Sequence, residues 1–177
     1  MTIYFGDGSS QSAAGLSGTG KVLKVVQAVK TDAELITTGT TWADIDDLEI
    51  AITPSSSSNK IFIMCDLAIA SVNCYDTKLR LYRDSTNIYK GDSVTNYVDA
   101  TKRSQVYDGS ANGYQMENIP LHFLDTPGAG AHTYKLQASS YSTVGVYINR
   151  TSTWTASSSS GYDGTCASSM TIMEVSG

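Results

Sequence analysis

The sequence has little charge and no basic patch. Only 16% of its 177 residues are Asp, Glu, Lys or Arg, against roughly 25% in an average soluble domain, so hydroxyl side chains carry much of the polar surface. The net charge is −5 and no block of Lys and Arg occurs, which removes the electrostatic footprint of a nucleic-acid-binding protein. We therefore expect neither DNA nor RNA as a partner.

The sequence also has no long apolar run. No stretch approaches the roughly 18 consecutive apolar residues of a membrane-spanning helix. Residues 1–8 (MTIYFGDG) contain neither a basic region nor an apolar run of signal-peptide length. We expect a soluble protein that is made in a cytoplasm and does not insert into a membrane.

The three cysteines and two histidines are too few for the common metal and catalytic motifs. Cys65, Cys74 and Cys166 include no close C-x-x-C pair. Cys65 is expected to be a packed thiol in an apolar run, whereas a Cys74–Cys166 disulfide stays open. Neither His122 nor His132 belongs to a nucleophile signature such as G-x-S-x-G. We expect no catalytic residue, no cofactor and therefore no enzyme.

Two further patterns bear on ligand binding. Residues Gly15–Lys21 (GLSGTGK) match the G-x-x-x-x-G-K of a phosphate-binding loop, but Val22 replaces the hydroxyl residue that holds magnesium, and a β-branched run follows where a helix is needed. We therefore do not expect nucleotide binding. Asp44 and Asp46 share one face of an expected strand and offer oxygen ligands of the kind that calcium takes; the alternative is that both are exposed acidic residues without a metal.

From residue 21 onward the sequence predicts an all-β domain. Apolar residues alternate in short segments that Gly, Asn, Asp and Ser separate. Strands at this spacing are typical of an antiparallel β-sandwich of jelly-roll type. Weak helical character occurs only at Thr31–Leu35, and a turn is expected at Thr53–Asn59. The expected strands are Lys21–Lys30, Trp42–Ile52, Ile61–Ala70, Lys78–Arg83, Gln115–Leu124, His132–Ser139, Val144–Asn149 and Ser169–Val175.

Residues 1–20 differ from the rest of the chain. From Gly6 to Gly20 the sequence is almost entirely Gly, Ser, Ala and Thr, which bury too little apolar area to offset the entropy lost on ordering. We expect a flexible N-terminal arm on a sandwich that spans residues 21–177. Ile3, Tyr4 and Phe5 are either an apolar anchor that binds another protein or part of a disordered start.

The segment Ile61–Ala70 (IFIMCDLAIA) is apolar on both faces. A strand of an antiparallel sandwich normally has one face in water, so a second layer must cover the other face, either the rest of the fold or a neighbouring subunit. A threefold axis can provide that cover. We expect a homotrimer with a subunit interface formed by Phe62, Met64, Ala68 and Ala70.

Tyrosine is the enriched aromatic, with 11 Tyr against 3 Phe and 2 Trp. Tyr combines a rigid apolar ring with a hydroxyl, which suits both recognition loops and interfaces. The polar, turn-rich stretch Asn87–Gly113 and its border predict ligand-recognition loops. The candidate residues are Tyr89, Tyr97, Tyr107 and Tyr114. The alternative is that these side chains cover the sandwich or the subunit seam.

Seven short phrases are informative when taken together. They are Gly20–Gln27 (GKVLKVVQ), Ile52–Ile61 (ITPSSSSNKI), Leu81–Thr86 (LYRDST), Phe123–Pro127 (FLDTP), Tyr134–Gln137 (YKLQ), Val146–Arg150 (VYINR) and Met170–Val175 (MTIMEV). In this order they resemble a family of small tail-fibre-like, virion structural proteins of marine and cyanobacterial tailed phages. The resemblance spans Lys21 to Val175.

The resemblance implies a non-enzymatic, jelly-roll-like β-sandwich, often trimeric, in a virion assembled in the host cytoplasm. The arm would bind another virion protein, and the knob would aid adsorption to the host surface, with a glycan as the expected ligand. The sequence contains no fibre shaft, which favours a short appendage on the tail, baseplate or head. A capsid-decorating or head-fibre protein is the main alternative; a polysaccharide-degrading tail enzyme and a cellular lectin-like module are further ones.

Overall fold

The computed structural model describes residues 2–4, 10–12, 20–37, 39–71, 76–95, 98–104, 113–140, 145–157 and 159–177. These residues contain strands and no helix, which confirms the predicted all-β class. Accordingly, no helix in the described ranges is long and apolar enough to cross a membrane. The strands are β1 (Thr2–Tyr4), β2 (Ser10–Ser12), β3 (Val22–Lys30), β4 (Glu34–Ile36), β5 (Ala43–Ile52), β6 (Lys60–Ser71), β7 (Thr77–Arg83), β8 (Thr86–Asn87), β9 (Lys102–Ser104), β10 (Glu117–Asp125), β11 (His132–Ser140), β12 (Val146–Ile148) and β13 (Ser168–Val175).

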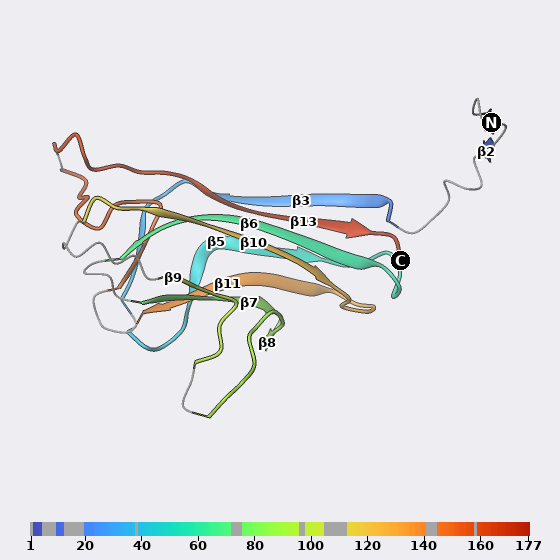
Figure 1. Cartoon of the computed structure of the whole chain (residues 1–177), viewed down its shortest axis with the longest axis horizontal. Helices are drawn as coiled ribbons and strands as arrows, with labels where there is room; N and C mark the ends of the chain where they lie inside the picture. Colours follow the sequence, from blue (N-terminus) through green and yellow to red (C-terminus); the bar gives the residue numbers. More distant parts are fainter. Residues whose placement is uncertain are drawn as a thin grey trace.

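Two antiparallel sheets face each other (Figure 1). In the first sheet β6 pairs with β10 along one side, and with β13 and then β12 along the other. Strands β3 and β4 extend this sheet beyond β13 and β12. In the second sheet β11 lies between β5 and β7, and the short strands β8 and β9 pair with the far side of β7.

The order of the strands is that of a jelly roll. The chain crosses from the first sheet (β3 and β4) to the second (β5), back to the first (β6) and again to the second (β7 to β9). It then places β10 in the first sheet, β11 in the second and β12 and β13 in the first. As a result β13 lies between β3 and β6, and β11 lies between β5 and β7, the interleaving expected of this fold. The predicted antiparallel sandwich is confirmed.

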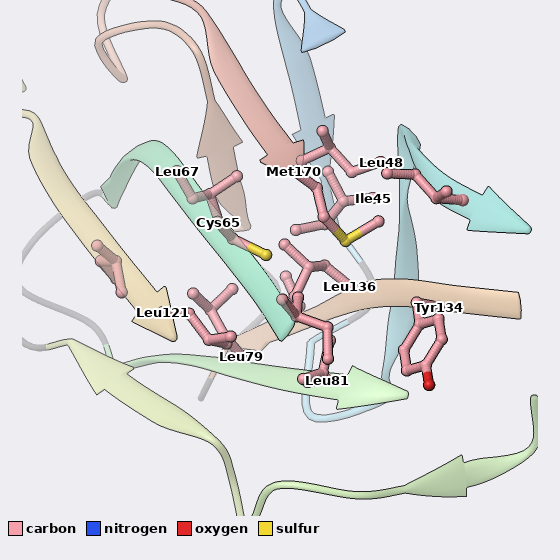
Figure 2. Packing of buried hydrophobic residues seen from close by; sticks show 14 of the residues in the cluster. Ile45, Leu48, Cys65, Leu67, Leu79, Leu81, Leu121, Tyr134, Leu136 and Met170 are labelled. Atoms are coloured by element: carbon pink, nitrogen blue, oxygen red, sulfur yellow. The ribbon is translucent and has the colours of Figure 1, made fainter. Parts of the chain in front are cut away.

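The core lies between the sheets because inward-facing apolar residues alternate along each long strand. Figure 2 shows side chains from both sheets meeting in this layer. Burying each such aliphatic side chain contributes roughly 1.5–3 kcal/mol relative to leaving it in water. Side chains with 2% exposure or less include Ile45, Leu48, Ile61, Ile63, Leu67, Leu79, Leu81, Leu121, Tyr134, Leu136, Met170 and Ile172.

The weak helix expected at Thr31–Leu35 is wrong. Strand β3 ends at Lys30 and β4 begins at Glu34, with an irregular link between them. The ammonium group of Lys30 is fully buried and lies 3.0 Å from Asp32 and 3.2 Å from Glu34. Residues Glu34–Ile36 instead pair with β12, and this pairing with a distant strand outweighs the weak local preference for a helix.

Strand β5 contains an irregularity in its middle. Its pairing with β11 shifts between Lys135 and Gln137, and Asp47 has a positive φ of 61°. This bulge lets both Ile45 and Leu48 point into the core. Asp44 and Asp46 remain exposed on the strand.

Both ends of the sandwich chain meet at one end of the molecule. The Gly20 N–H donates to the Ser176 carbonyl at 2.8 Å, and the Ser176 N–H donates to the Lys21 carbonyl at 2.9 Å. The first residue of β13, Ser168, pairs with Lys30 at the opposite end. The loop of residues 149–167 therefore lies at the end away from residues 20 and 176 (Figure 1).

The described part of the N-terminal arm contains a short antiparallel ladder. Thr2 pairs with Ser12, and Tyr4 pairs with Ser10. Ile3 lies in β1 of this ladder, whereas Phe5, the third residue of the expected anchor, lies outside the described residues. The arm therefore has some regular backbone pairing, which does not require a buried apolar core.

Candidate assembly and recognition surfaces

An apolar row crosses the outer face of the first sheet. The strand register places Leu124 beside Phe62, Phe62 beside Met173, and Met173 beside Val25. Their side chains alternate with inward-facing neighbours, so they point away from the core. Leu124 is 49% exposed and Val25 is 56% exposed, while Phe62 and Met173 are half-buried. A continuous apolar row is thus in contact with solvent.

The next row on the same face is mixed and contains a hollow. Here the register aligns His122, Met64, Thr171 and Gln27. A hollow of about 320 Å³ opens beside this row, lined by Met64, Cys65, Asp66, Pro120, His122, Ser169 and Thr171. We call Val25, Val29, Phe62, Met64, Leu124 and Met173 the apolar face.

Strand β3 adds an open edge to the apolar face. Among the described strands it pairs with β13 alone, and it exposes Val22 (48%), Leu23 (44%) and Val29 (51%). An unpaired edge that also carries apolar side chains favours association with another chain. The apolar face and the β3 edge therefore form one candidate assembly surface.

The structure divides the predicted subunit interface into two parts. Phe62 and Met64 are half-buried and lie on the apolar face. Ala68 and Ala70 are only 9% and 4% exposed within the chain itself. For these two alanines the expectation of a role in subunit contact needs correction, because their own chain covers them.

The cover over Ala70 comes from β12 and the segment that follows it. Tyr147 pairs directly with Ala70 and lies on the same side of the sheet. The guanidinium of Arg150 lies 4.8 Å from the Tyr147 ring centre and 5.5 Å from that of Trp154. This stacked group accounts for the second apolar face in this half of β6.

The outer face of the second sheet is polar. Asp44 accepts hydrogen bonds from Lys135 at 2.7 Å and Gln137 at 2.6 Å, and the Arg80 guanidinium lies 3.9 Å from the Trp42 ring centre. Burial raises the pKa of Asp44, but these hydrogen bonds and the Lys135 charge outweigh it, so the pKa is lowered overall. With the Lys135 ammonium at its carboxylate, Asp44 offers a poor site for the calcium ion considered from the sequence.

Metal and thiol sites are equally unpromising among the residues with described positions. No group of three or more His, Cys, Asp or Glu side chains in those residues is arranged to hold a metal. Cys65 is buried, and burial raises its thiol pKa to about 12. Cys166 is a free, exposed thiol, while Cys74, its possible disulfide partner, lies outside the described residues.

A second candidate surface lies at the loop end of the sandwich. Tyr162 is 78% exposed and Tyr114 is 45% exposed. Their ring centres are 5.5 Å apart, and the ring planes are tilted by 47°. Two segments that are far apart in sequence therefore present one aromatic pair to solvent.

Hydrogen bonds hold these two segments together. The Gly113 carbonyl accepts from the backbone N–H of Ser152 at 3.0 Å and of Thr153 at 3.4 Å. The Asp163 carboxylate accepts from the hydroxyls of Thr151 at 3.0 Å and Thr153 at 2.5 Å. A Cβ on Gly113 would lie 2.3 Å from the Thr153 methyl carbon, so only glycine permits this close approach.

The predicted recognition tyrosines have different surroundings. The ring of Tyr89 stacks on Phe123 with centres 4.7 Å apart and planes within 12°, and it packs against the core. Tyr89 is therefore part of the cover over the sandwich, which corrects its assignment to a recognition loop. Tyr114 is at the loop end as described, whereas Tyr97 and Tyr107 lie outside the described residues.

The sequence analysis did not include Tyr162 among the candidate recognition residues. Tyr162 lies in a stretch of Ser and Gly (SSSSGYDG, residues 157–164) that contains no other large apolar residue. An isolated ring in such a segment has no apolar neighbours with which to form a core, and that signal favours exposure.

The strands thus place the candidate assembly surface along the first sheet and the aromatic pair at the loop end. The end of the sandwich at Gly20 and Ser176 is opposite that pair. Comparison with protein-family models and with curated proteins yields no match for this sequence.

Proposed function

We propose that this chain is a non-enzymatic structural protein of a bacteriophage particle. In this proposal it forms a homotrimeric β-sandwich appendage, attached through residues 1–20, that aids adsorption to the host surface. The observation that carries the proposal is the apolar row of Val25, Met173, Phe62 and Leu124 on the outside of the sandwich. A protein that works alone in solution has little use for such a row.

The energetics of the apolar face support self-association. Val25 and Leu124 still expose about half of their surface, and covering each would contribute on the order of 1 kcal/mol. Residues with less exposure, such as Phe62 and Met64, add smaller amounts. Since every copy contributes the same face, the sum grows with each interface formed.

Closed symmetry explains how the face can be covered without unlimited growth. An exposed edge such as β3 recruits further chains unless the assembly closes on itself. A trimer brings three copies of the apolar face around one axis and leaves the polar outer face of the second sheet in water. The polar residues on that face, including Asp44, Arg80 and Lys135, fit an outward position.

The position of the chain ends supports attachment at one pole. The sandwich begins beside its own last strand at Gly20 and Ser176, so residues 1–20 join it at that end. The loops that carry Tyr114 and Tyr162 lie at the other end. An appendage needs this separation, since one end must bind the particle and the other must face outward.

The mass of the full chain in solution tests the assembly step. Light scattering at micromolar concentration should give three times the 18.9 kDa mass of one chain. The double variant Val25→Lys/Leu124→Lys should be monomeric, because two charges would have to be buried at each interface. Val94→Lys/Val98→Lys is the matched control, since both valines are 56% exposed but lie outside the apolar face.

Cryo-electron microscopy of the intact particle tests the virion assignment. Density for the sandwich on the tail or baseplate is the expected result, and density on the head shell would identify a capsid-decorating or head-fibre protein instead. Absence of the chain from purified particles would overturn the virion assignment. A strictly monomeric parent chain would overturn the trimer.

A further inference from the structure

The aromatic pair at the loop end is the exposed feature that the fold and the assembly surface leave unexplained. Tyr162 and Tyr114 have exposed fractions of 78% and 45%, although the sandwich buries many other apolar side chains almost completely. A single exposed ring is common on protein surfaces. Two rings that come from different loops and lie 5.5 Å apart require a scaffold that holds them.

That scaffold is present, and it acts on the residues next to each ring. Tyr114 follows Gly113, and Tyr162 precedes Asp163. Thr153 connects both neighbours: its backbone N–H donates to the Gly113 carbonyl at 3.4 Å, and its hydroxyl donates to Asp163 at 2.5 Å. The spacing of the two rings is therefore set by Thr153 rather than by contact between the rings alone.

The surroundings of the pair determine which ligands fit. The described residues of the loop around it are rich in exposed hydroxyls, at Thr155, Ser157, Ser159 and Ser160. Arg150, the basic side chain among the described residues of this loop, stacks on Tyr147 and Trp154, so the pair does not resemble a phosphate site built from free basic groups. Aromatic faces bordered by hydroxyls match a sugar, whose C–H bonds form an apolar face and whose rim carries hydroxyls.

We propose that Tyr114 and Tyr162 form a saccharide-binding platform, with Thr153 as its positioning residue. The pyranose rings of a surface polysaccharide stack on the tyrosines, and the loop hydroxyls bind the sugar hydroxyls. The ring planes are tilted by 47°, so the two rings are not stacked face to face. This inference rests on the proposed adsorption role and assigns it a ligand class and a site.

The test applies the full chain to an array of purified bacterial O-antigen and capsular polysaccharides. Each polysaccharide that binds the chain on the array is then cast into a gel for affinity electrophoresis. We expect the parent chain to bind at least one of them. Tyr162→Ala and Tyr114→Ala should each weaken that binding roughly tenfold, because each removes one stacking surface. Val94→Ala, which truncates an apolar side chain that is 56% exposed elsewhere, should bind like the parent.

Conservative variants separate stacking from general stickiness and from misfolding. Tyr162→Phe keeps the ring and should retain binding within about twofold, whereas Tyr162→Leu keeps apolar area without a ring and should lose binding like Tyr162→Ala. Thr153→Ser keeps the hydroxyl and should bind better than Thr153→Val. Thermal unfolding of each variant checks that the fold is intact. We expect the Tyr162 variants to fold like the parent, because the exposed Tyr162 side chain contributes little to packing.

Three results would overturn the platform. They are failure of the parent chain to bind any polysaccharide on the array, equal binding by Tyr114→Ala/Tyr162→Ala and the parent, and equal binding by Tyr162→Leu and Tyr162→Phe. Cryo-electron microscopy of the intact particle tests the proposed function separately. A chain that is present on the particle but binds no polysaccharide removes only this inference, whereas tyrosine-dependent binding by a chain absent from the particle removes only the virion assignment.

Discussion

The side-chain amide of Asn149 donates a 2.9 Å hydrogen bond to the main-chain carbonyl of Lys30, and so joins the segment after β12 to the end of β3. Asn149 is fully buried. Its amide also lies 3.1 Å from the Asp32 carbonyl, and its side-chain oxygen accepts from the Ser168 hydroxyl at 2.5 Å. One side chain thus connects the ends of three strands.

Substitutions of Asn149 should lower the stability of the fold by different amounts. Asn149→Gly should lower the free energy of unfolding by roughly 2–4 kcal/mol, because buried carbonyls and the Ser168 hydroxyl lose their partner. Asn149→Ala should cost about 1 kcal/mol more, since the φ of 59° is unfavourable for a residue with a Cβ. Urea denaturation measures both values. Equal stability of the Gly variant and the parent would contradict the proposed connection, and an Ala variant more stable than Gly would contradict the backbone argument.

Glu174 predicts a loss of stability in acid. Its carboxylate is 3% exposed and accepts from the Ser55 N–H, the Ser55 hydroxyl and the Asn59 amide, each at 2.6 Å. The hydrogen bonds from Ser55 lower the pKa of Glu174 in spite of its burial. The stabilising contribution of Glu174 is therefore complete above the unfolded pKa of about 4.3, and it is lost as the pH falls through the lower folded pKa.

Urea midpoints measured between pH 7 and pH 3 check this prediction. Glu174→Gln should be less stable than the parent at neutral pH, and the difference should shrink as the pH falls. Glu49→Gln, a change on an exposed strand position, is the control and should follow the parent. If the parent and Glu174→Gln keep a constant difference over this range, the carboxylate does not act through its ionisation.

Cys166 and Cys65 should differ strongly in the rate at which their thiols react. In a Cys74→Ser background, the exposed Cys166 should react with Ellman's reagent within seconds to minutes at mildly alkaline pH. Cys65 is 4% exposed and has its pKa raised to about 12 by burial, so it should react only when the sandwich opens. Replacing Cys166 with Ser should remove the fast phase. A fast phase that persists would show that Cys65 is accessible in the folded protein.

Removal of the N-terminal arm should leave folding intact but prevent attachment to the particle. A chain that begins at Gly20 keeps the hydrogen bonds to Ser176 and both sheets, so its thermal midpoint should lie within a few degrees of that of the parent. Particles assembled with the shortened chain should lack the appendage. Normal incorporation would remove the anchor role of Ile3, Tyr4 and Phe5.

The long strands could be predicted because the alternation of apolar residues indicates which side chains of each strand face the core. Ile50 and Ile52, or Leu79 and Leu81, face the core in the way that the pattern predicts. The short strands β4, β8 and β9 could not be predicted, since two or three residues carry no periodicity and pairing with a longer strand defines them. Strand β9, for example, exists through its pairing with β7.

The candidate surfaces were only partly predictable for a related reason. Phe62 and Ala70 are both apolar in the sequence, but Tyr147 pairs with Ala70 from a distant strand, and Phe62 keeps more exposure than Ala70. Similarly, Tyr89 and Tyr162 both occur in polar loops. Only the packing of Tyr89 on Phe123 distinguishes this partly buried ring from the exposed ring of Tyr162.

The opposed ends of the sandwich have a mechanical consequence. A pull between the particle and a bound host surface would draw β3 toward Gly20 and the neighbouring β13 toward the loop of residues 149–167. The two strands would slide past each other along their length, in shear. Because the hydrogen bonds of an antiparallel ladder run across the strands, they would bear this load together and not break one at a time, as in a zipper. If the proposed attachment at residues 1–20 holds, the same topology would also resist detachment under flow.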